Sequence, residues 1–201
     1  MKFTKIISSL LALGALLMLL SACQNIKKTQ LVLFESLSFG MSPKSFEEVF
    51  GEASEVEEET EMAYRDTWRA EDPYFYKTGR LFYDYENIAL NGYTGRARFT
   101  FSKSHRLEKA TAHIPVASKG EQYVVLNNLS QTIKKEIEAL PNVQSVTTET
   151  VGLYDDGYRY KVKLKGQRRE FWIDVYPTED EDAKEIEDKK YTIRVDQFRM
   201  H

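Results

Sequence analysis

The chain has one cysteine, Cys23, among its 201 residues, and this excludes a disulfide within the protein. It has only three histidines, His105, His113 and His201, so few side chains are available as metal ligands or catalytic bases. A G-x-S-x-G nucleophile motif and a glycine-rich phosphate loop are both absent. Stability must therefore come from a packed core, for which an aromatic content of 12% provides large side chains.

The few residues that could support catalysis or bind a metal lie in unsuitable contexts. Ser42 falls at an expected helix cap, and His113 falls on an expected strand, where a histidine is usually structural. The acidic run beginning at Asp180 does not match an EF-hand loop, because Glu185 stands where the loop needs glycine and Tyr191 where it needs glutamate. The sequence therefore predicts a protein that is not an enzyme and that holds no metal or cofactor.

The chain is mildly acidic, with a formal net charge of −3. Residues 1–22 include two lysines and no acidic residue, so the remainder has 26 basic and 31 acidic side chains and a net charge of −5. Because nucleic-acid-binding domains usually carry a strong positive charge, a nucleic-acid partner is not expected. The length of this remainder corresponds to one or two small domains.

The N-terminus has the order of a secretory signal. Lys2 and Lys5 precede an apolar run over residues 6–20, and two small residues, Ser21 and Ala22, follow it. The apolar run is shorter than the roughly 20 residues that a membrane-spanning helix needs. Residues 1–22 are therefore predicted to be a signal peptide that is removed.

The sequence Leu20-Ser21-Ala22-Cys23 resembles the lipobox of bacterial lipoprotein precursors. The resemblance implies that the Cys23 thiol takes a diacylglycerol, that the chain is cleaved before Cys23, and that the new amino terminus is also acylated, for example with palmitate. Two or three acyl chains would give a stable anchor. The alternative is a buried free cysteine in an ordinary signal or membrane segment.

This resemblance implies an extracytoplasmic protein held to the membrane through the lipid on Cys23. Residues 23–30 are polar after the cysteine and are expected to form a short tether. In a Gram-negative cell, Gln24 in place of aspartate resembles the signal for the outer membrane, and the protein would then lie on its periplasmic face. In another cell type it would lie on the cell surface.

Residues 31–116 are expected to form a helix followed by antiparallel strands. Ser42 is a natural N-cap, Pro43 suits the first helical position, and Gly51 suits the C-cap, so a two-turn helix is predicted between them. Its core-facing residues should be Phe46, Val49 and Phe50. Period-two alternation from residue 55 and strand-like runs at 80–88, 96–101 and 107–114 predict a meander that ends at Pro115.

Residues 117–201 repeat this order of elements. Ser118 and Glu121 have the spacing of a capping box. They open a helix that Pro141 ends and whose apolar stripe comprises Tyr123, Leu126, Leu129, Ile133, Ile137 and Leu140. Strands are expected at 143–153, 158–164, 169–176 and 190–198. In the second of these, tyrosine, valine and leucine alternate with arginine and lysine, which predicts one buried and one solvated face.

The first helix carries a second family resemblance. Gly40-Met41-Ser42, a helix with Phe46 and Val49, and then Gly51 resemble the opening of the SmpA/OmlA (BamE-like) lipoproteins, which are similar to β-lactamase-inhibitor-protein-like modules. Trp68 and the Phe99-Thr100-Phe101 hairpin strand fill comparable places, although Glu52 stands where the family has proline. The family implies a small lipid-anchored interaction module with a helix and an antiparallel sheet.

These patterns together predict an α+β fold. It consists of two units of a helix followed by an antiparallel β-meander, at 31–116 and 117–201. One continuous sheet is equally compatible with the pattern.

An aromatic cluster follows the first helix and suggests a binding surface. Tyrosine and tryptophan offer large contact areas with one polar edge. We expect Trp68, Tyr83 and Tyr85 to contact a protein, peptide or glycan, with Trp68 and Tyr85 as exposed anchors; the alternative is that half of the cluster is core. The cluster comprises Tyr64, Trp68, Tyr74, Phe75, Tyr76, Phe82, Tyr83 and Tyr85.

A cationic strand face in the second half suggests a different surface. These side chains could approach anionic lipid headgroups or cell-wall polymers, or they could pair with acidic neighbours in the sheet. The face comprises Arg159, Lys161, Lys163 and Lys165, followed by Arg168 and Arg169.

The predicted function is a lipid-anchored extracytoplasmic binding or assembly module without catalytic activity, acting on an envelope protein. The alternative is an inhibitor or sensor that binds an envelope or secreted enzyme. A third hypothesis is a hydrolase of envelope material that uses His113.

Globomycin, which blocks the lipoprotein signal peptidase, should make the uncleaved precursor accumulate in expressing cells. The variant Cys23→Ala should lose membrane fractionation, because it lacks the thiol that takes the lipid. Immunoblots of cell fractions measure both. A Cys23→Ala protein that is processed and fractionates like the parent would contradict the lipoprotein interpretation.

Overall fold

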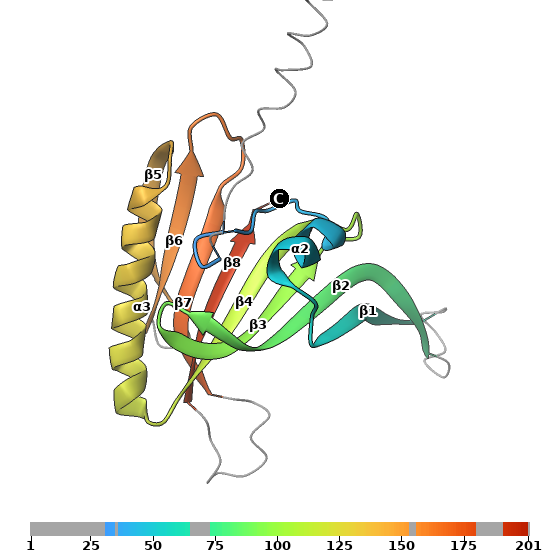
Figure 1. Cartoon of the computed structure of the whole chain (residues 1–201), viewed down its shortest axis with the longest axis horizontal. Coiled ribbons are helices and arrows are strands. Elements are labelled where there is room, and N and C mark those ends of the chain that lie inside the picture. The colour runs from blue at the N-terminus through green and yellow to red at the C-terminus, as the bar shows by residue number, and fades with distance from the viewer. Residues whose placement is uncertain (1–30, 35, 65–72, 153–155, 180–190, 201) are drawn as a thin grey trace, which may run out of the picture.

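The structure is a computed structural model, and it describes residues 31–34, 36–64, 73–152, 156–179 and 191–200 (Figure 1). The predicted signal peptide, Cys23 and the tether therefore lie outside the described residues. The elements are α2 (Pro43–Phe50), β1 (Glu55–Tyr64), β2 (Pro73–Leu90), β3 (Tyr93–Phe101), β4 (Leu107–Val116), α3 (Lys119–Ala139), β5 (Val143–Val151), β6 (Gly157–Leu164), β7 (Phe171–Glu179) and β8 (Tyr191–Arg199).

The eight strands of the described residues belong to one antiparallel sheet, in the order β1-β2-β3-β4-β8-β7-β6-β5. The prediction of an α+β fold with two separate helix-plus-meander units is wrong. The last strand, β8, pairs with β4 over residues 109–116, so the two meanders meet inside one sheet. The described part of the chain is consequently mostly β, and the continuous-sheet alternative is the one found.

Both helices lie on the same face of this sheet, which we call the covered face. Helix α3 contacts β7, β8, β6 and β4, and α2 packs its Phe46 ring on β2 and β3 (Figure 1). Residues 31–34 and 36–41 lie on the same face, where the Phe34 ring contacts Phe99 and the Val32 N–H donates to the Gln197 side chain of β8. Buried residues from both halves of the chain form one core cluster.

Helix α2 begins and ends where its sequence predicts. The Ser42 hydroxyl accepts a hydrogen bond from the Ser45 N–H, and Gly51 ends the helix at φ 94°, a conformation that favours glycine. Phe46 is fully buried beneath the helix. The prediction that Val49 also faces the core is wrong, because its side chain is 50% exposed.

Helix α3 has the predicted capping box, in which the Ser118 hydroxyl accepts from the Glu121 N–H. The Glu121 carboxylate accepts in return from the Ala117 N–H. Tyr123, predicted in the apolar stripe, is 45% exposed instead. The residues of α3 that are buried are Gln122, Val125, Leu126, Leu129, Ser130, Ile133 and Ile137.

Two strands differ from the predicted runs. Strand β2 is longer, because register shifts beside Glu58 and after Tyr85 interrupt the period-two pattern without ending the strand. Pro115 does not end β4. The β3–β4 pairing stops at His113, so Pro115 lies where β4 pairs with β8 alone, a position that tolerates a missing N–H.

Phe46→Ala should lower the free energy of unfolding by about 4 kcal/mol, because it empties a site surrounded by aromatic rings. The ring centroids of Phe99 and Phe101 lie 4.7 and 5.4 Å from that of Phe46. Urea denaturation followed by circular dichroism measures the change. The control Val49→Ala, on the exposed side of the same helix, should change stability by less than about 0.5 kcal/mol; equal effects would contradict this assignment of the core.

Candidate binding surface

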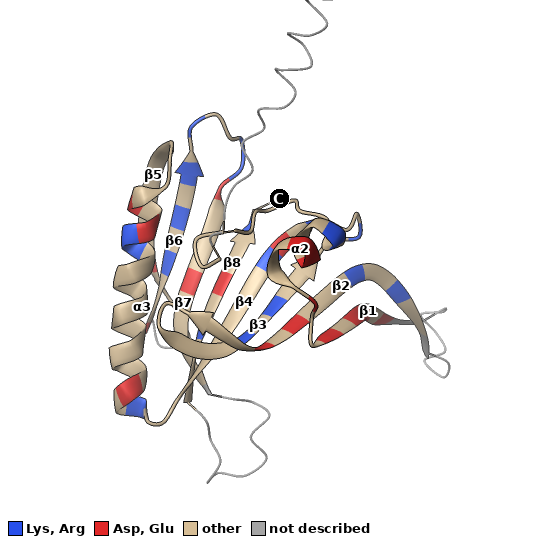
Figure 2. Cartoon of the chain, in the orientation of Figure 1, with Lys and Arg blue, Asp and Glu red and all other residues tan. Residues whose placement is uncertain are grey.

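The second face of the sheet, which we call the open face, has no described helix against it. Cross-strand neighbours in the antiparallel register form one row of polar side chains across the open face, from β2 to β5. The row consists of Asp84, Arg98, Thr111, Asp196, Asp174, Arg159 and Glu149. A neighbouring row combines aromatic and cationic residues: Phe82, Thr100, Lys109, Phe198, Trp172 and Lys161. Charged residues of both signs mark these strands in Figure 2.

Asp196 lies at the centre of the open face, and only 7% of its side chain is exposed. Its Oδ1 accepts a hydrogen bond of 2.6 Å from the Thr111 hydroxyl and lies 3.0 Å from Lys109 Nζ. Its Oδ2 accepts from Tyr176 Oη and Arg194 Nε, each at 3.0 Å. Donors from three strands therefore hold this carboxylate in place.

The same contacts decide the pKa of Asp196. Burial by itself would raise the pKa, but the hydrogen bond from Thr111 and the charges of Lys109 and Arg194 outweigh burial, so the pKa lies below its ordinary value. The neighbouring Tyr176 shows the opposite change. Burial and, to a smaller extent, the negative charge of Asp196 raise the pKa of Tyr176. The phenol therefore keeps its proton and remains a hydrogen-bond donor.

Trp172 lies between two cations on this face. The Arg159 guanidinium carbon is 4.6 Å and the Lys161 Nζ is 4.8 Å from the indole ring. Arg159 also makes a bidentate pair with Asp174, at 2.7 and 2.6 Å, which fixes the guanidinium plane. The Phe198 ring packs edge-on against the indole at 5.8 Å. The indole is therefore held beside two cations that are themselves ion-paired, Arg159 with Asp174 and Lys161 with Glu149.

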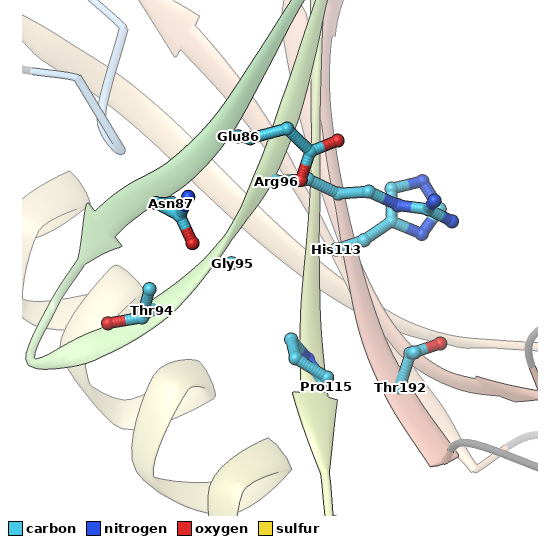
Figure 3. A pocket seen from close by; sticks show the side chains of 8 residues that line it. All are labelled: Glu86, Asn87, Thr94, Gly95, Arg96, His113, Pro115 and Thr192. Atoms are coloured by element: carbon cyan, nitrogen blue, oxygen red, sulfur yellow. The ribbon is translucent and has the colours of Figure 1, made fainter.

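A pocket of about 240 Å³ opens at one end of the same face. Arg96 and His113, which are register partners on β3 and β4, line it and project in one direction (Figure 3). Glu86 lies on the β2 side, and Pro115 and Thr192 close the β4–β8 side (Figure 3). The pocket offers both hydrogen-bond donors and a carboxylate, which suits a polar segment of a partner.

Two residues of the predicted cationic face, Arg159 and Lys161 of β6, are committed to partners within the sheet. Arg159 binds Asp174, and Lys161 Nζ lies 2.6 Å from Glu149. These two residues therefore pair with acidic neighbours in the sheet, the second of the two alternatives given for the cationic face. They are not free to bind anionic lipids or cell-wall polymers. The open face is better suited to a partner that contacts aromatic rings and balanced charges, as protein interfaces do.

Of the predicted partner-binding aromatics, Tyr83 and Tyr85 do not form this surface. Trp68 lies outside the described residues. The prediction that Tyr85 is an exposed anchor is wrong: Tyr83 and Tyr85 are 6% and 5% exposed and lie in the core beneath α2. The Tyr85 hydroxyl donates a hydrogen bond of 2.8 Å to the Gly51 carbonyl. Burial and, to a smaller extent, the negative charge of Glu47 raise the pKa of Tyr85 to about 12.

Trp172 and Phe198 were missed by the sequence prediction, although the sequence contains a signal for them. In residues 171–176, Phe171, Ile173 and Val175 are buried while Trp172 and Tyr176 alternate with them. A tryptophan on the solvated side of a strand is informative, because exposed aromatic residues are enriched in interfaces.

Within the described residues, no group of three or more histidine, cysteine, aspartate or glutamate side chains is arranged to hold a metal ion. The described helices include none long and apolar enough to cross a membrane.

No protein-family model matches the sequence, and neither the curated proteins nor the solved structures contain a significant match to it. The resemblances to lipoprotein precursors and to BamE-like modules therefore stay predictions.

Asp196→Asn should lower the free energy of unfolding at pH 7 by about 2 kcal/mol, the size of hydrogen bonds to a buried charged group. Because the native pKa is depressed, the carboxylate's contribution is fully present above the ordinary value of 3.8 and is lost as the pH falls through the native pKa. The stability difference between wild type and variant should therefore shrink below pH 4.

Urea titrations from pH 7 to pH 2 measure this difference. The matched control is Asp84→Asn, which breaks a more exposed pair with Arg98 and should cost about 0.5 kcal/mol. A difference that stays constant down to pH 2 would contradict the assigned role of Asp196.

Proposed function

We propose that this chain is a lipid-anchored extracytoplasmic binding or assembly module without catalytic activity, and that its open face captures an envelope protein. The observation that carries the proposal is the arrangement around Trp172. A half-buried indole is fixed between Arg159 and Lys161 and backed by Phe198, on the face that neither described helix contacts. Rigid aromatic anchors beside arginine are the residues that dominate binding energy in protein interfaces.

The charge pattern of the open face favours a protein partner over a polyanion. The cations at its centre already contact Asp174 and Asp196, so a polyanion would have to compete with these carboxylates. A protein surface that offers aromatic contacts and a few hydrogen bonds needs no such exchange. The pocket beside Arg96 and His113 would add polar contacts at the rim of the same surface.

The point at which the predicted tether joins the folded part supports the open face as the binding surface. The predicted tether, residues 23–30, places Cys23 eight residues before Leu31, a span of at most about 29 Å. Leu31, the first described residue, is fully buried, and the next residue, Val32, bonds to Gln197 on the covered face. The proposed tether would therefore join the folded part on the covered side, which leaves the open face free for a partner.

A second candidate function is that of an inhibitor or sensor of an envelope or secreted enzyme, and one observation favours it. Residues 60–64 of β1 pair with 73–77 of β2, whereas β3 pairs with β2 only from Leu81 onward, so these residues form a two-stranded arm (Figure 1). Phe75 on this arm is 67% exposed. An exposed aromatic on a projecting arm suits insertion into an enzyme cleft.

Trp172→Ala should weaken capture of the envelope partner at least about tenfold, because it removes the central ring of the proposed interface. Crosslinking of the acylated full chain in its native envelope, followed by quantitative mass spectrometry, measures the capture. Phe75→Ala, an exposed aromatic on the arm, serves as the matched control and should retain it.

The reverse pattern, with capture lost in Phe75→Ala and retained in Trp172→Ala, would contradict the open face as the binding surface and support the inhibitor or sensor. Circular dichroism of both variants verifies that the sheet is intact.

A further inference from the structure

Basic side chains without an acidic partner gather at one end of the sheet. Four of them belong to the predicted cationic face, and the fifth stands at the end of β8. Among the residues that the structure describes, none of the five forms an ion pair with a carboxylate. They differ in this from Arg159 and Lys161, which lie further from this end and are ion-paired. The set, which we call the basic end, comprises Lys163, Lys165, Arg168, Arg169 and Arg199.

The turn between β6 and β7 lies beside the last residues of β8. Phe171 and Arg199 are register partners, and the Met200 N–H donates to the Glu170 carbonyl at 3.1 Å. Burial lowers the pKa of Arg199, and the charge of Arg169 lowers it further, as expected for two neighbouring guanidinium groups. Figure 2 shows basic residues at this end of β6 and in the turn that follows it. The fold therefore holds like charges together without a counter-charge of its own.

The turn between β3 and β4 adds charge of the same sign at this end. Strand β4 begins beside the end of β8, since Lys109 is the register partner of Phe198. Residues 102–106 include Lys103 and Arg106, both exposed, and no acidic residue. The neighbouring strands run in the order β3-β4-β8-β7-β6, and adjacent strands are about 4.8 Å apart, so these cations extend over about 20 Å.

The predicted tether joins the folded part near the basic end. The Val32 N–H donates to the side chain of Gln197, which lies two residues before Arg199 on β8. Leu31, the preceding residue, is fully buried. Because Cys23 is eight residues before Leu31, a lipid on Cys23 would lie at most about 29 Å from this point. The anchor would thus keep a membrane surface within reach of the unpaired cations.

We propose that the basic end binds the anionic lipid headgroups of the membrane that holds the acyl chains of Cys23. The inference rests on the proposed function, because the lipid anchor brings the membrane to this end. Headgroup phosphates supply the negative charge that the fold lacks there, and each lysine or arginine near an anionic membrane strengthens binding about fivefold. The acidic remainder of the chain opposes this little, since salt screens charges more than about 10 Å away. The sheet then stands on the membrane by one end, which leaves the open face accessible.

Headgroup quenching of a fluorescent dye on the acylated chain tests this orientation. Cys23 is the only cysteine, so once it is acylated Ser104→Cys provides a single thiol, in the exposed turn between β3 and β4. The vesicles contain phosphatidylcholine and a quencher attached to lipid headgroups, with or without phosphatidylglycerol. Phosphatidylglycerol should increase the quenching about twofold or more, and high salt should remove the increase.

A dye at Ala117→Cys, which is exposed at the opposite end of β4, should show no such increase. No effect of phosphatidylglycerol at Ser104→Cys, an equal effect at Ala117→Cys, or an effect that persists in high salt would overturn the proposal.

Charge reversal assigns the effect to the basic end. Arg168→Glu, in the chain labelled at Ser104→Cys, should remove most of the increase that phosphatidylglycerol causes. The matched control Lys119→Glu changes the net charge equally, at another exposed residue without an ion pair in the described structure. Lys119 lies in the first turn of α3, at the other end of the sheet, so this variant should retain the increase. Equal losses in the two variants would overturn the proposal.

Flotation with neutral vesicles separates this proposal from the proposed function. The acylated chain should float with phosphatidylcholine alone, and a chain that does not float lacks the anchor, which contradicts the proposed function. Flotation of such a chain with anionic vesicles, lost in Arg168→Glu, would still support the basic end as a headgroup site. Flotation with neither kind of vesicle, or sedimentation with an anionic cell-wall polymer without any effect of phosphatidylglycerol, would overturn it.

Discussion

Strand β8 is the last strand of the chain, yet it pairs with β4, from Lys109 with Phe198 to Val116 with Tyr191. This pairing joins the first four strands to the other three, so every row of side chains that crosses the sheet passes through it. On the covered face it brings both halves of the chain into one core. On the open face it brings the Thr111 hydroxyl to Asp196. Without this contact there would be two small sheets, and the central carboxylate would lose the Thr111 hydroxyl and the Lys109 ammonium of β4.

The two faces of the sheet have different roles because side chains alternate along every strand. The covered face supplies stability through an aromatic core beneath α2, in which the Phe46, Phe99 and Phe101 rings are fully buried. Such a core is needed in a chain with one cysteine and therefore no disulfide. On the open face, Arg98, Arg159 and Lys161 bind laterally to carboxylates in neighbouring strands. That lateral pairing holds Trp172 in place and makes the surface suitable for a partner.

The sequence by itself determined the local elements, because residues close in the chain decide them. The caps at Ser42 and Ser118, the span of α3 and the alternation along β6 all follow from neighbouring residues. Only the tertiary structure decided which strands are neighbours and which aromatic rings are covered. Alternation shows that two side chains share a face, but not that a helix covers that face, and for this reason Tyr85 was expected at the surface and lies in the core. The donor to Asp196 from Thr111 comes from 85 residues away, a distance at which no local pattern can indicate contact.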